Sequence, residues 1–482
     1  MTLPRKAMAA AAALVMLLAG CAVGPDYRKP ETPMPDNFRG AQASAAAQSL
    51  ADLPWWDIYK DETLTGLIRA ALSDNFDLRV AVTRVEQARA MVAEARAQLF
   101  PWFSYQGNLT FGRDEFYGQP DPSGTNSTAG YFTGSVLWEL DIWGRVRRLT
   151  ESARAQFLAT EEARRGVVLT LVSDVATAYF ELLELDEELA IARRNADSFA
   201  QSLKLFQDRL GGGVASTLET DSAEALFESA SASIPELERQ IAIKENQISI
   251  LLGRSPREVA HRAALLEQAL PPEVPAGLPS ALLERRPDVR QAEQLLRSAN
   301  AQIGVAKADF FPQINLTGFL GRVAPSLPAM TNGTWNAWSL GGTLVGPIFQ
   351  GGLLRAQYRQ AKAAWEQAKL QYQQTALSAL QEVSDALISR QKFEEVRQQQ
   401  ARAVAAYREA VRVAMERFRA GRASYYEVLL AQQQIFPAET ALARTQLGQL
   451  LTVVQLYKAL GGGWQTEGAQ AAKPGSPGAP PR

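Results

Sequence analysis

The stretch from Val146 to Leu210 constrains the fold most, because it contains no proline and its apolar residues follow a coiled-coil pattern. From Val168 onward they recur at alternating steps of three and four residues, which is the seam of a coiled coil. The seam positions are Val168, Leu171, Val175, Ala178, Leu182, Leu185, Leu189, Ala192, Ala196, Phe199, Leu203, Phe206 and Leu210. At 1.5 Å per residue, one helix over this stretch is roughly 100 Å long. We therefore expect long partner helices elsewhere in the chain.

The N-terminus has the pattern of an export signal over residues 1–20. Arg5 and Lys6 precede an apolar run that is too short to cross a bilayer as a helix. The run ends in Leu-Ala-Gly before Cys21, which resembles the bacterial lipobox, so we expect Cys21 to be the lipidation site. Ala22 at the next position favours delivery to the outer membrane. The alternative is an ordinary signal peptide followed by an incidental cysteine.

The composition excludes several classes of function. Fifty basic and 51 acidic residues give a net charge of −1, so the charge balance does not indicate a nucleic-acid partner. One histidine, His261, and one cysteine remove most metal, thiol and histidine chemistries. The sequence has no phosphate-binding loop and no Gly-x-Ser-x-Gly motif. We predict that the chain is not an enzyme and has neither a cofactor nor a metal site. After the signal, no segment has 18 consecutive apolar residues, so we expect no transmembrane helix.

Two segments show the alternation typical of strands that are apolar on one face. The first segment, Trp102 to Phe111, alternates apolar with polar residues. The second segment, from about Phe132 to Leu140, follows a loop over residues 112–130. Asp141 then precedes the long helix, where a carboxylate fits a capping role better than a catalytic one.

The pattern occurs twice along the chain. Phe100-Pro101 matches Phe311-Pro312 at an offset of 211, and the turn that begins at Arg209 matches the turn that begins at Arg417 at an offset of 208. The predicted organisation is a lipidated leader (21–61), repeat 1 (62–255), a linker (256–279), repeat 2 (280–464) and a disordered tail (465–482). Repeat 1 holds a β-hairpin (102–141), the long helix (146–210) and a helix (216–252). Repeat 2 holds a β-hairpin (313–346), a second long helix (353–418) and a helix (424–460).

The two hairpins favour an outer-membrane β-barrel. Their strands of about ten residues are apolar on one face and polar on the other, and aromatic residues at their ends suit membrane interfaces. These aromatics are Trp102, Trp138, Trp143, Phe310, Phe311 and Trp335. Four strands cannot close a barrel, and lipid does not tolerate free strand edges. The chain is therefore expected to assemble as a dimer, trimer or tetramer. A soluble β-domain with aromatics in its core is the alternative.

Five segments together resemble the outer-membrane efflux factor family, the TolC-like and OprM-like channels, in its lipoprotein branch. They are CAVGPDYRKP (21–30), WELDIWGR (138–145), IPELER (234–239), LLGR (251–254) and LERRPD (283–288). The resemblance implies an α+β membrane protein that forms a homotrimer. Its twelve strands would form one outer-membrane β-barrel, continued by a twelve-helix α-barrel in the periplasm. It also implies a periplasmic adaptor and an inner-membrane pump of the resistance-nodulation-division or a related class as partners, with outer-membrane lipid around the barrel. The implied function is passive export of small molecules such as drugs.

The resemblance also places a gate beside the helix turns at the periplasmic tip. It implies that Tyr426 and Leu430, one helical turn apart, point into the lumen. The gate residues by this comparison are Asp208, Arg209, Arg417, Arg419, Arg422, Tyr425, Tyr426 and Leu430. Glu219 and Asp221 are further candidates for ion pairs with the arginines. The turns that would receive the adaptor contain Gly211, Gly213, Ala420 and Gly421. The competing hypothesis is a lipid-anchored coiled-coil protein that spans the envelope and conducts nothing.

Overall fold

The computed structural model describes residues 22–41, 58, 60–112, 127–260, 264–268, 279–324, 327–332 and 336–462. The predicted signal, Cys21, His261, Trp335 and the predicted tail lie outside the described residues. The chain divides into two compact units. Unit 1 contains Met1–Glu31, Arg84–Glu161 and Gln291–Gln373, and unit 2 contains Thr32–Thr83, Glu162–Arg290 and Gln374–Arg482. Each unit takes segments from both sequence repeats, because corresponding parts of the two repeats pack together.

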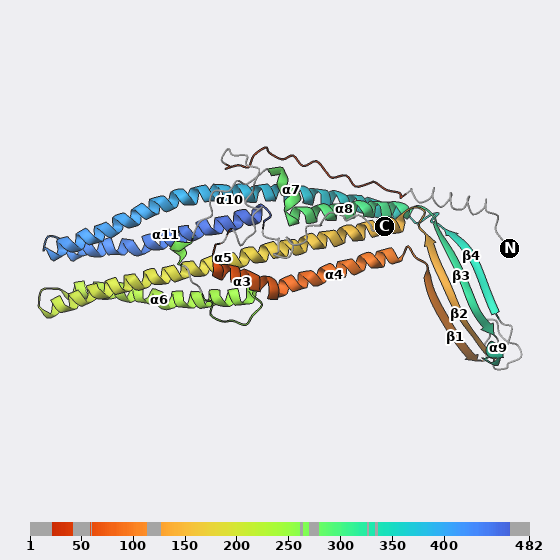
Figure 1. Cartoon of the computed structure of the whole chain (residues 1–482), viewed down its shortest axis with the longest axis horizontal. Helices are drawn as coiled ribbons and strands as arrows, with labels where there is room; N and C mark the ends of the chain where they lie inside the picture. Colours follow the sequence, from red (N-terminus) through yellow and green to blue (C-terminus); the bar gives the residue numbers. More distant parts are fainter. Residues whose placement is uncertain are drawn as a thin grey trace, which may run out of the picture. The chain divides into compact units, whose positions relative to one another are not determined.

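Unit 1 contains one antiparallel sheet in the order β1-β2-β3-β4 (Figure 1). The strands are β1 (Trp102–Gly112), β2 (Ser127–Leu140), β3 (Gln313–Ala324) and β4 (Asn336–Val345). Strand β2 begins earlier than the sequence predicts, because its first residues continue the ladder opposite Phe111 and Gly112. A short helix that the sequence did not predict, α9 (Leu327–Asn332), lies between β3 and β4.

Two very long helices connect the sheet residues to the rest of the chain. Helix α5 spans Arg145–Gly211 and helix α10 spans Leu353–Arg419, each slightly longer than predicted. Each hairpin is preceded by a shorter helix, α4 (Phe76–Ala97) or α8 (Pro287–Ala308). The remaining helices are α3 (Glu62–Asp74), α6 (Thr217–Leu251), η2 (Leu265–Glu267), η3 (Pro279–Ala281), α7 (Leu282–Arg285) and α11 (Tyr425–Ala459). Helix α6 continues through Pro235.

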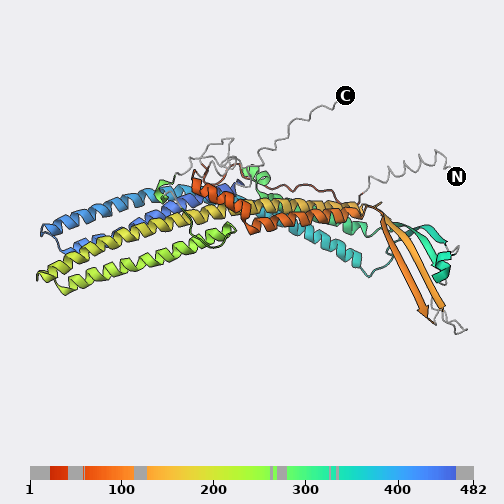
Figure 2. The same cartoon turned by 60° about the horizontal axis from the view of Figure 1, so that its bottom comes forward.

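The core of unit 2 follows the predicted seam of α5. Every seam position from Val168 to Phe206 is buried except Leu203, which is half-buried like Leu210. The covering residues come from two helices, since Leu185, Leu189 and Ala192 pack with Leu237 of α6 and with Phe436 of α11. Figure 2 shows α6 running beside α5 and α11 beside α10, as Figure 1 also does. The seam is therefore covered within one chain.

Helix α10 has a more mixed surface than α5. Its buried apolar positions, Tyr372, Ala376, Ala379, Val383 and Ala386, follow the same three–four spacing. The next buried position is Val404, beyond the segment interrupted by Arg390 and Arg397.

Of the helices in the described part of the chain, only α5 contains an 18-residue stretch that is apolar enough to cross a bilayer. Because 67% of that window is buried inside the structure, its apolar character is that of a core helix.

Candidate functional site: the sheet surface and the helix-tip turns

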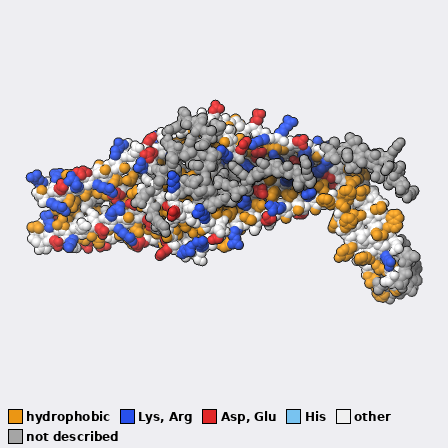
Figure 3. Space-filling model, viewed as in Figure 1, with side chains coloured by type: hydrophobic (Ala, Val, Ile, Leu, Met, Phe, Trp, Pro, Cys, Tyr) orange, Lys and Arg blue, Asp and Glu red, His pale blue; other side chains and the backbone are white. Residues whose placement is uncertain are grey.

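Strand pairing places the apolar residues of all four strands on one face of the sheet. Directly paired residues share a face, and the ladder pairs Phe103 with Val136, Trp138 with Leu316, and Ile314 with Leu344. The same face carries Tyr105, Leu109, Phe111, Phe132, Leu320, Trp338 and Leu340. These side chains are open to solvent in the single chain, with Tyr105 81% and Leu340 79% exposed. Figure 3 shows hydrophobic side chains gathered over the strands.

The opposite face of the sheet is mostly polar. It carries Ser104, Gln106, Asn108, Thr110, Thr133, Ser135, Glu139, Asn315, Thr317, Ser339 and Thr343. Ser104 and Ser135 hydrogen bond across β1 and β2 at 2.7 Å between their Oγ atoms. A sheet with one broad exposed apolar face and one polar face suits a wall between lipid and water. The outer edges of β1 and β4 are unpaired within this sheet.

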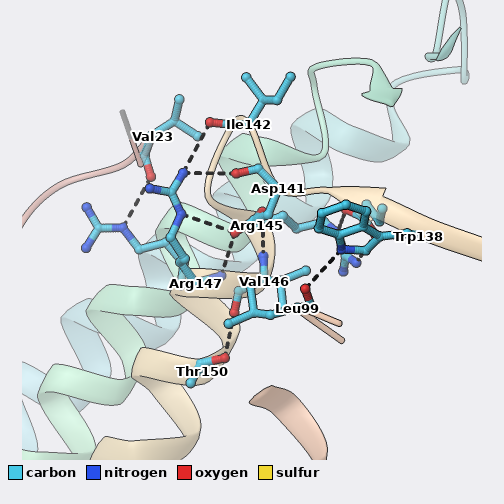
Figure 4. A network of polar contacts seen from close by, with 11 residues as sticks. Val23, Leu99, Trp138, Asp141, Ile142, Arg145, Val146, Arg147 and Thr150 are labelled. Carbon is cyan, nitrogen blue, oxygen red and sulfur yellow. Dashed lines mark hydrogen bonds and ion pairs between the residues drawn. The ribbon is translucent and has the colours of Figure 1, made fainter. Parts of the chain in front are cut away.

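A network of polar contacts fixes the junction between β2 and α5 (Figure 4). The Asp141 carboxylate accepts hydrogen bonds from the backbone N–H groups of Val146 and Arg147, both at 2.9 Å, and forms an ion pair with the Arg147 guanidinium at 3.2 Å. The capping role predicted for Asp141 is therefore confirmed.

Aromatic side chains near the junction also bond to the backbone. The Trp138 indole donates to the Leu99 carbonyl at 3.0 Å, and the Trp143 indole donates to the Pro312 carbonyl at 2.8 Å. Trp143 also stacks on Phe311 with 4.7 Å between ring centroids. Two of the aromatics predicted for the strand ends, Trp143 and Phe311, therefore meet at this junction.

The two helix-tip turns in unit 2 have the same backbone geometry. Gly213 and Gly421 have φ of +75° and +69°, in the left-handed region that favours glycine. After α5, Gly213 N–H donates to Leu210 and Val214 N–H to Arg209; after α10, Gly421 N–H donates to Phe418 and Arg422 N–H to Arg417. This pair of bonds is the Schellman motif. Gly211 ends α5 and Ala420 follows α10, so the predicted tip residues form two equivalent turns.

An aromatic cluster joins the two turns. It contains Tyr425, one of the predicted gate residues, with Phe206 and Phe418, which the sequence did not identify as functional. The Tyr425 ring lies 4.0 Å from the Phe206 ring and 5.3 Å from the Phe418 ring, measured between centroids. Arg209 lies over the Phe418 ring at 5.0 Å. Tyr425 is 2% exposed, so within one chain it packs the tips together. The heptad pattern contains Phe206, but spacing alone does not tell which aromatic it meets.

Tyr426 and Leu430 project from the tip, 67% and 44% exposed. The nearby arginines are arranged differently from the predicted ion pairs. Arg417 pairs with Glu427 at 3.2 Å and also donates to the carbonyl of Arg422. Glu219 instead forms a capping box with Ser216 at the start of α6. Within one copy, the described residues contain no ion pair between Arg417, Arg419 or Arg422 and Asp208, Glu219 or Asp221.

The exposed apolar face of the sheet and the very long paired helices are features of an outer-membrane channel protein. The chain belongs to the outer membrane efflux protein family, whose model matches residues 67–254 and 278–462. It functions as an outer-membrane channel component of efflux systems, extending into the periplasm. The two matched segments correspond to the two sequence repeats.

Comparisons with known proteins agree over most of the chain. The toluene efflux pump outer membrane protein TtgC of Pseudomonas putida is 36% identical over 472 residues, which cover 97% of each chain. The cation efflux system protein CusC of Escherichia coli is 31% identical, covering 94% of this chain and 98% of its own. The solved structure of the outer-membrane channel OprN superposes with a TM-score of 0.84 at 31% identity, covering 92% of this chain and 100% of OprN.

Proposed function

We propose that three copies of this chain form one passive export conduit. Three four-stranded sheets would supply a twelve-stranded barrel in the outer membrane, and the helices would continue it as a twelve-helix tube in the periplasm. The observation that carries this proposal is a sheet with an exposed apolar face and two unpaired edges, because lipid does not tolerate open edges. A periplasmic adaptor would bind the tip turns, and an inner-membrane pump would supply the energy.

The internal repeat provides a template for the pairing between copies. The two hairpins have the same register, since Trp102 pairs with Leu137 in the first and Gln313 pairs with Val345 in the second. The repeat offset of 211 relates Trp102 to Gln313, and the offset of 208 relates Leu137 to Val345. The contact between repeats, β2 with β3, is therefore the model for the contact of β4 with β1 of the next copy.

Applying the offsets gives a specific register between copies. Ser135 of β2 pairs with Phe319 of β3 in the chain. Thr343 of β4 is the repeat equivalent of Ser135, and Asn108 of β1 is the equivalent of Phe319, so Thr343 should pair with Asn108 of the next copy. In the same way, the pair of Phe132 with Arg322 predicts that Leu340 pairs with Phe111 of the next copy. In both predicted pairs the two residues belong to the same kind of face, polar in the first and apolar in the second. A register shifted by one residue would place apolar side chains opposite polar ones.

Cysteine cross-linking tests this register. Asn108→Cys with Thr343→Cys should form disulfides between copies, because paired residues lie within the Cα distance that a disulfide spans. Covalent dimers and trimers should appear on non-reducing denaturing gels. The matched control is Asn108→Cys with Gly341→Cys, which places the second cysteine two positions along β4, about 7–8 Å away. Equal cross-linking by the two pairs, or none by the first, would contradict the proposed barrel.

We propose that Tyr426 and Leu430 narrow the tube at its tip, supported by their exposure one turn apart beside the second turn. The buried Tyr425 would hold the tips together, with Arg209 on Phe418. Asp208, Arg417, Arg419 and Arg422 would form ion pairs between copies.

Single-channel conductance in a planar bilayer tests the gate. Wild type should conduct poorly, and the double variant Tyr426→Ala with Leu430→Ala should conduct freely. Leu218→Ala is the matched control, because Leu218 has the same position after the first turn and is exposed. An increase with the control, or none with the double variant in an assembled trimer, would place the constriction elsewhere.

The substrates are proposed to be small toxic molecules, such as drugs or solvents, and the pump would select them. Relatives named for toluene and for cations share the fold, which supports a conduit that does not itself select its substrate. We also propose that Cys21 carries the lipid anchor.

A further inference from the structure

The described strands carry only two charged side chains, and these lie on opposite faces of the sheet. Glu139 is on the polar face, where it forms an ion pair with Arg145 at 2.6 Å. Arg322 is on the apolar face, because it pairs with Phe132 of β2 and with Asn336 of β4. Its side chain is exposed, and no carboxylate among the described residues forms an ion pair with it. A cation without a counter-charge is therefore present on an otherwise apolar surface.

Arg322 lies near the end of the sheet that is away from the long helices. Strand β3 follows α8 and strand β4 leads back to α10, so the other ends of these strands are beside α9 (Figure 1). From Ile314 to Arg322 the chain rises roughly 26 Å at about 3.3 Å per residue, or about 20 Å in height for a tilted barrel strand. The apolar band of such a barrel is about 25 Å tall. Because the channel extends into the periplasm, Arg322 is close to the outer limit of this band.

Helix α9 covers the sheet surface just beyond Arg322. Ala324, two residues further on the same face, is 1% exposed. A Cβ atom on Gly130, the partner of Ala324, would lie 3.5 Å from the Met330 sulfur atom of α9. The Met330 carbonyl also accepts a hydrogen bond from the Arg322 guanidinium at 2.9 Å. Arg322 is thus held at the last position of β3 where the apolar face is open.

The chemistry of this position suits a phosphate group. A guanidinium has several N–H donors and binds phosphate in a bidentate manner, and the Met330 carbonyl leaves most of these donors available. Asn336, exposed and paired directly with Arg322, adds an amide donor on the same face. The fold itself does not require a charge here, because the repeat equivalent of Arg322 is the apolar, exposed Phe111.

We propose that Arg322, with Asn336, binds a phosphate group of lipid A in the outer leaflet of the outer membrane. Lipid A is the phosphorylated glycolipid of that leaflet, and its phosphates lie at the boundary of the apolar band. The acyl chains of the same molecule would cover the apolar side chains below, among them Phe132 and Leu340. Each copy would hold one such lipid at a fixed position on the barrel. This inference rests on the proposed barrel, whose apolar face contacts lipid.

Native mass spectrometry of the full-length protein with added diphosphoryl lipid A tests the site. Up to one lipid per copy should stay bound to the wild-type trimer, and Arg322→Gln should weaken this binding by about tenfold. Arg355→Gln is the matched control, because it removes the same charge from an exposed arginine in the first turn of α10. It should leave binding unchanged. Equal binding by the two variants would overturn the site.

Variation of the ligand shows which group the arginine recognises. Lipid A without phosphates should bind wild type as weakly as the diphosphoryl form binds Arg322→Gln. Inorganic phosphate should not displace the lipid, because the free ion lacks the acyl contacts, and displacement would overturn the assignment to a lipid. Arg322→Lys should recover part of the binding, since it keeps the charge and loses the bidentate geometry. If Arg322→Gln does not assemble, Asn336→Ala should show a smaller loss, and no loss would contradict the proposal.

The same spectra separate this inference from the proposed conduit. They give the mass of the assembly, so a particle that is not a trimer would contradict the barrel. A trimer that binds phosphorylated and phosphate-free lipid A equally would contradict only the phosphate site.

Discussion

At the scale of single residues, buried polar groups determine several positions that apolar packing leaves open. Asp141, with its side chain 8% exposed, binds the first amides of α5 and thereby fixes where the strand ends and the helix begins. Glu394 on α10 accepts a hydrogen bond from the buried Gln449 of α11 at 2.7 Å. Each contact depends on one acidic side chain, so a single substitution can test it.

Asp141→Ala should destabilise the junction by about 1–2 kcal/mol, because two backbone N–H groups at the helix start lose their acceptor. The measurement is the midpoint of thermal unfolding in detergent. Asp77→Ala, at an exposed acidic residue in the first turn of α4, is the control and should shift the midpoint much less. Equal shifts would show that the carboxylate acts only through its charge.

Glu394 should make stability depend on pH in the acidic range. Hydrogen bonds from Arg397, then Gln398 and Gln449, lower its pKa from 4.5 to about 2. The folded chain therefore keeps Glu394 ionised where the unfolded chain protonates it, so this stabilisation is complete above about pH 4.5 and is lost as the pH falls toward 2. Because the side chain is 41% exposed, the effect should stay below about 1 kcal/mol.

Unfolding curves of wild type and Glu394→Gln between pH 5 and 2.5 measure this contribution. The difference between the two proteins should shrink as the pH falls. A difference that is constant with pH would assign the effect to the neutral hydrogen bonds.

At the scale of elements, α6 and α11 each cover α5 with both apolar and polar contacts. Helix α6 contributes Ile234, Leu237 and Ile241 to an apolar contact. Helix α11 contributes polar contacts along α5, including Gln432 with Ser198 at 3.2 Å and Arg444 with Glu188 at 2.7 Å. Both contacts combine apolar and polar groups, since Lys244 of α6 pairs with Glu181 of α5 at 2.7 Å and Phe436 of α11 packs on the apolar seam of α5.

Arg444→Ala should weaken the α5–α11 contact by about 1–2 kcal/mol. It leaves Glu188 and Glu184, both buried and one helical turn apart, without the guanidinium that faces them at 2.7 and 3.8 Å. Faster hydrogen exchange along α11 is the expected signature. Adding Glu188→Gln should recover most of the loss, because it removes one of the two facing carboxylates. A double variant no better than the single one would contradict this explanation.

At the scale of the whole molecule, neighbouring residues on β4 should respond in opposite ways to the same charge. Leu340 lies on the apolar face and Ser339 on the polar face. In the proposed barrel, Leu340→Arg would expose a charge to lipid at a cost of about 2–4 kcal/mol per copy near the bilayer centre. Ser339→Arg would face water.

Recovery of assembled protein from outer membranes measures this difference. Leu340→Arg should reduce it strongly, and Ser339→Arg should leave it near wild type. Equal recovery of the two variants would contradict the assignment of the apolar face to lipid.

The periodicity of the sequence determined much of this protein by itself. Alternation predicted the apolar face of each strand, and the three–four spacing predicted the buried side of α5. The offsets of 211 and 208 predicted the repeat that the strand registers and turns reproduce. Such features are local, because each depends on the side-chain direction that the backbone imposes at a fixed spacing.

Only the tertiary structure decided which segments meet. It paired β2 with β3, joined Phe206 to Tyr425 at the tips, and placed Asp26 and Pro25 against Arg148 and Asn300. Spacing shows which face of an element is buried but not what covers it. The choice of partner depends on the shape and hydrogen-bonding groups of residues far apart in the chain, and these become neighbours only when it folds.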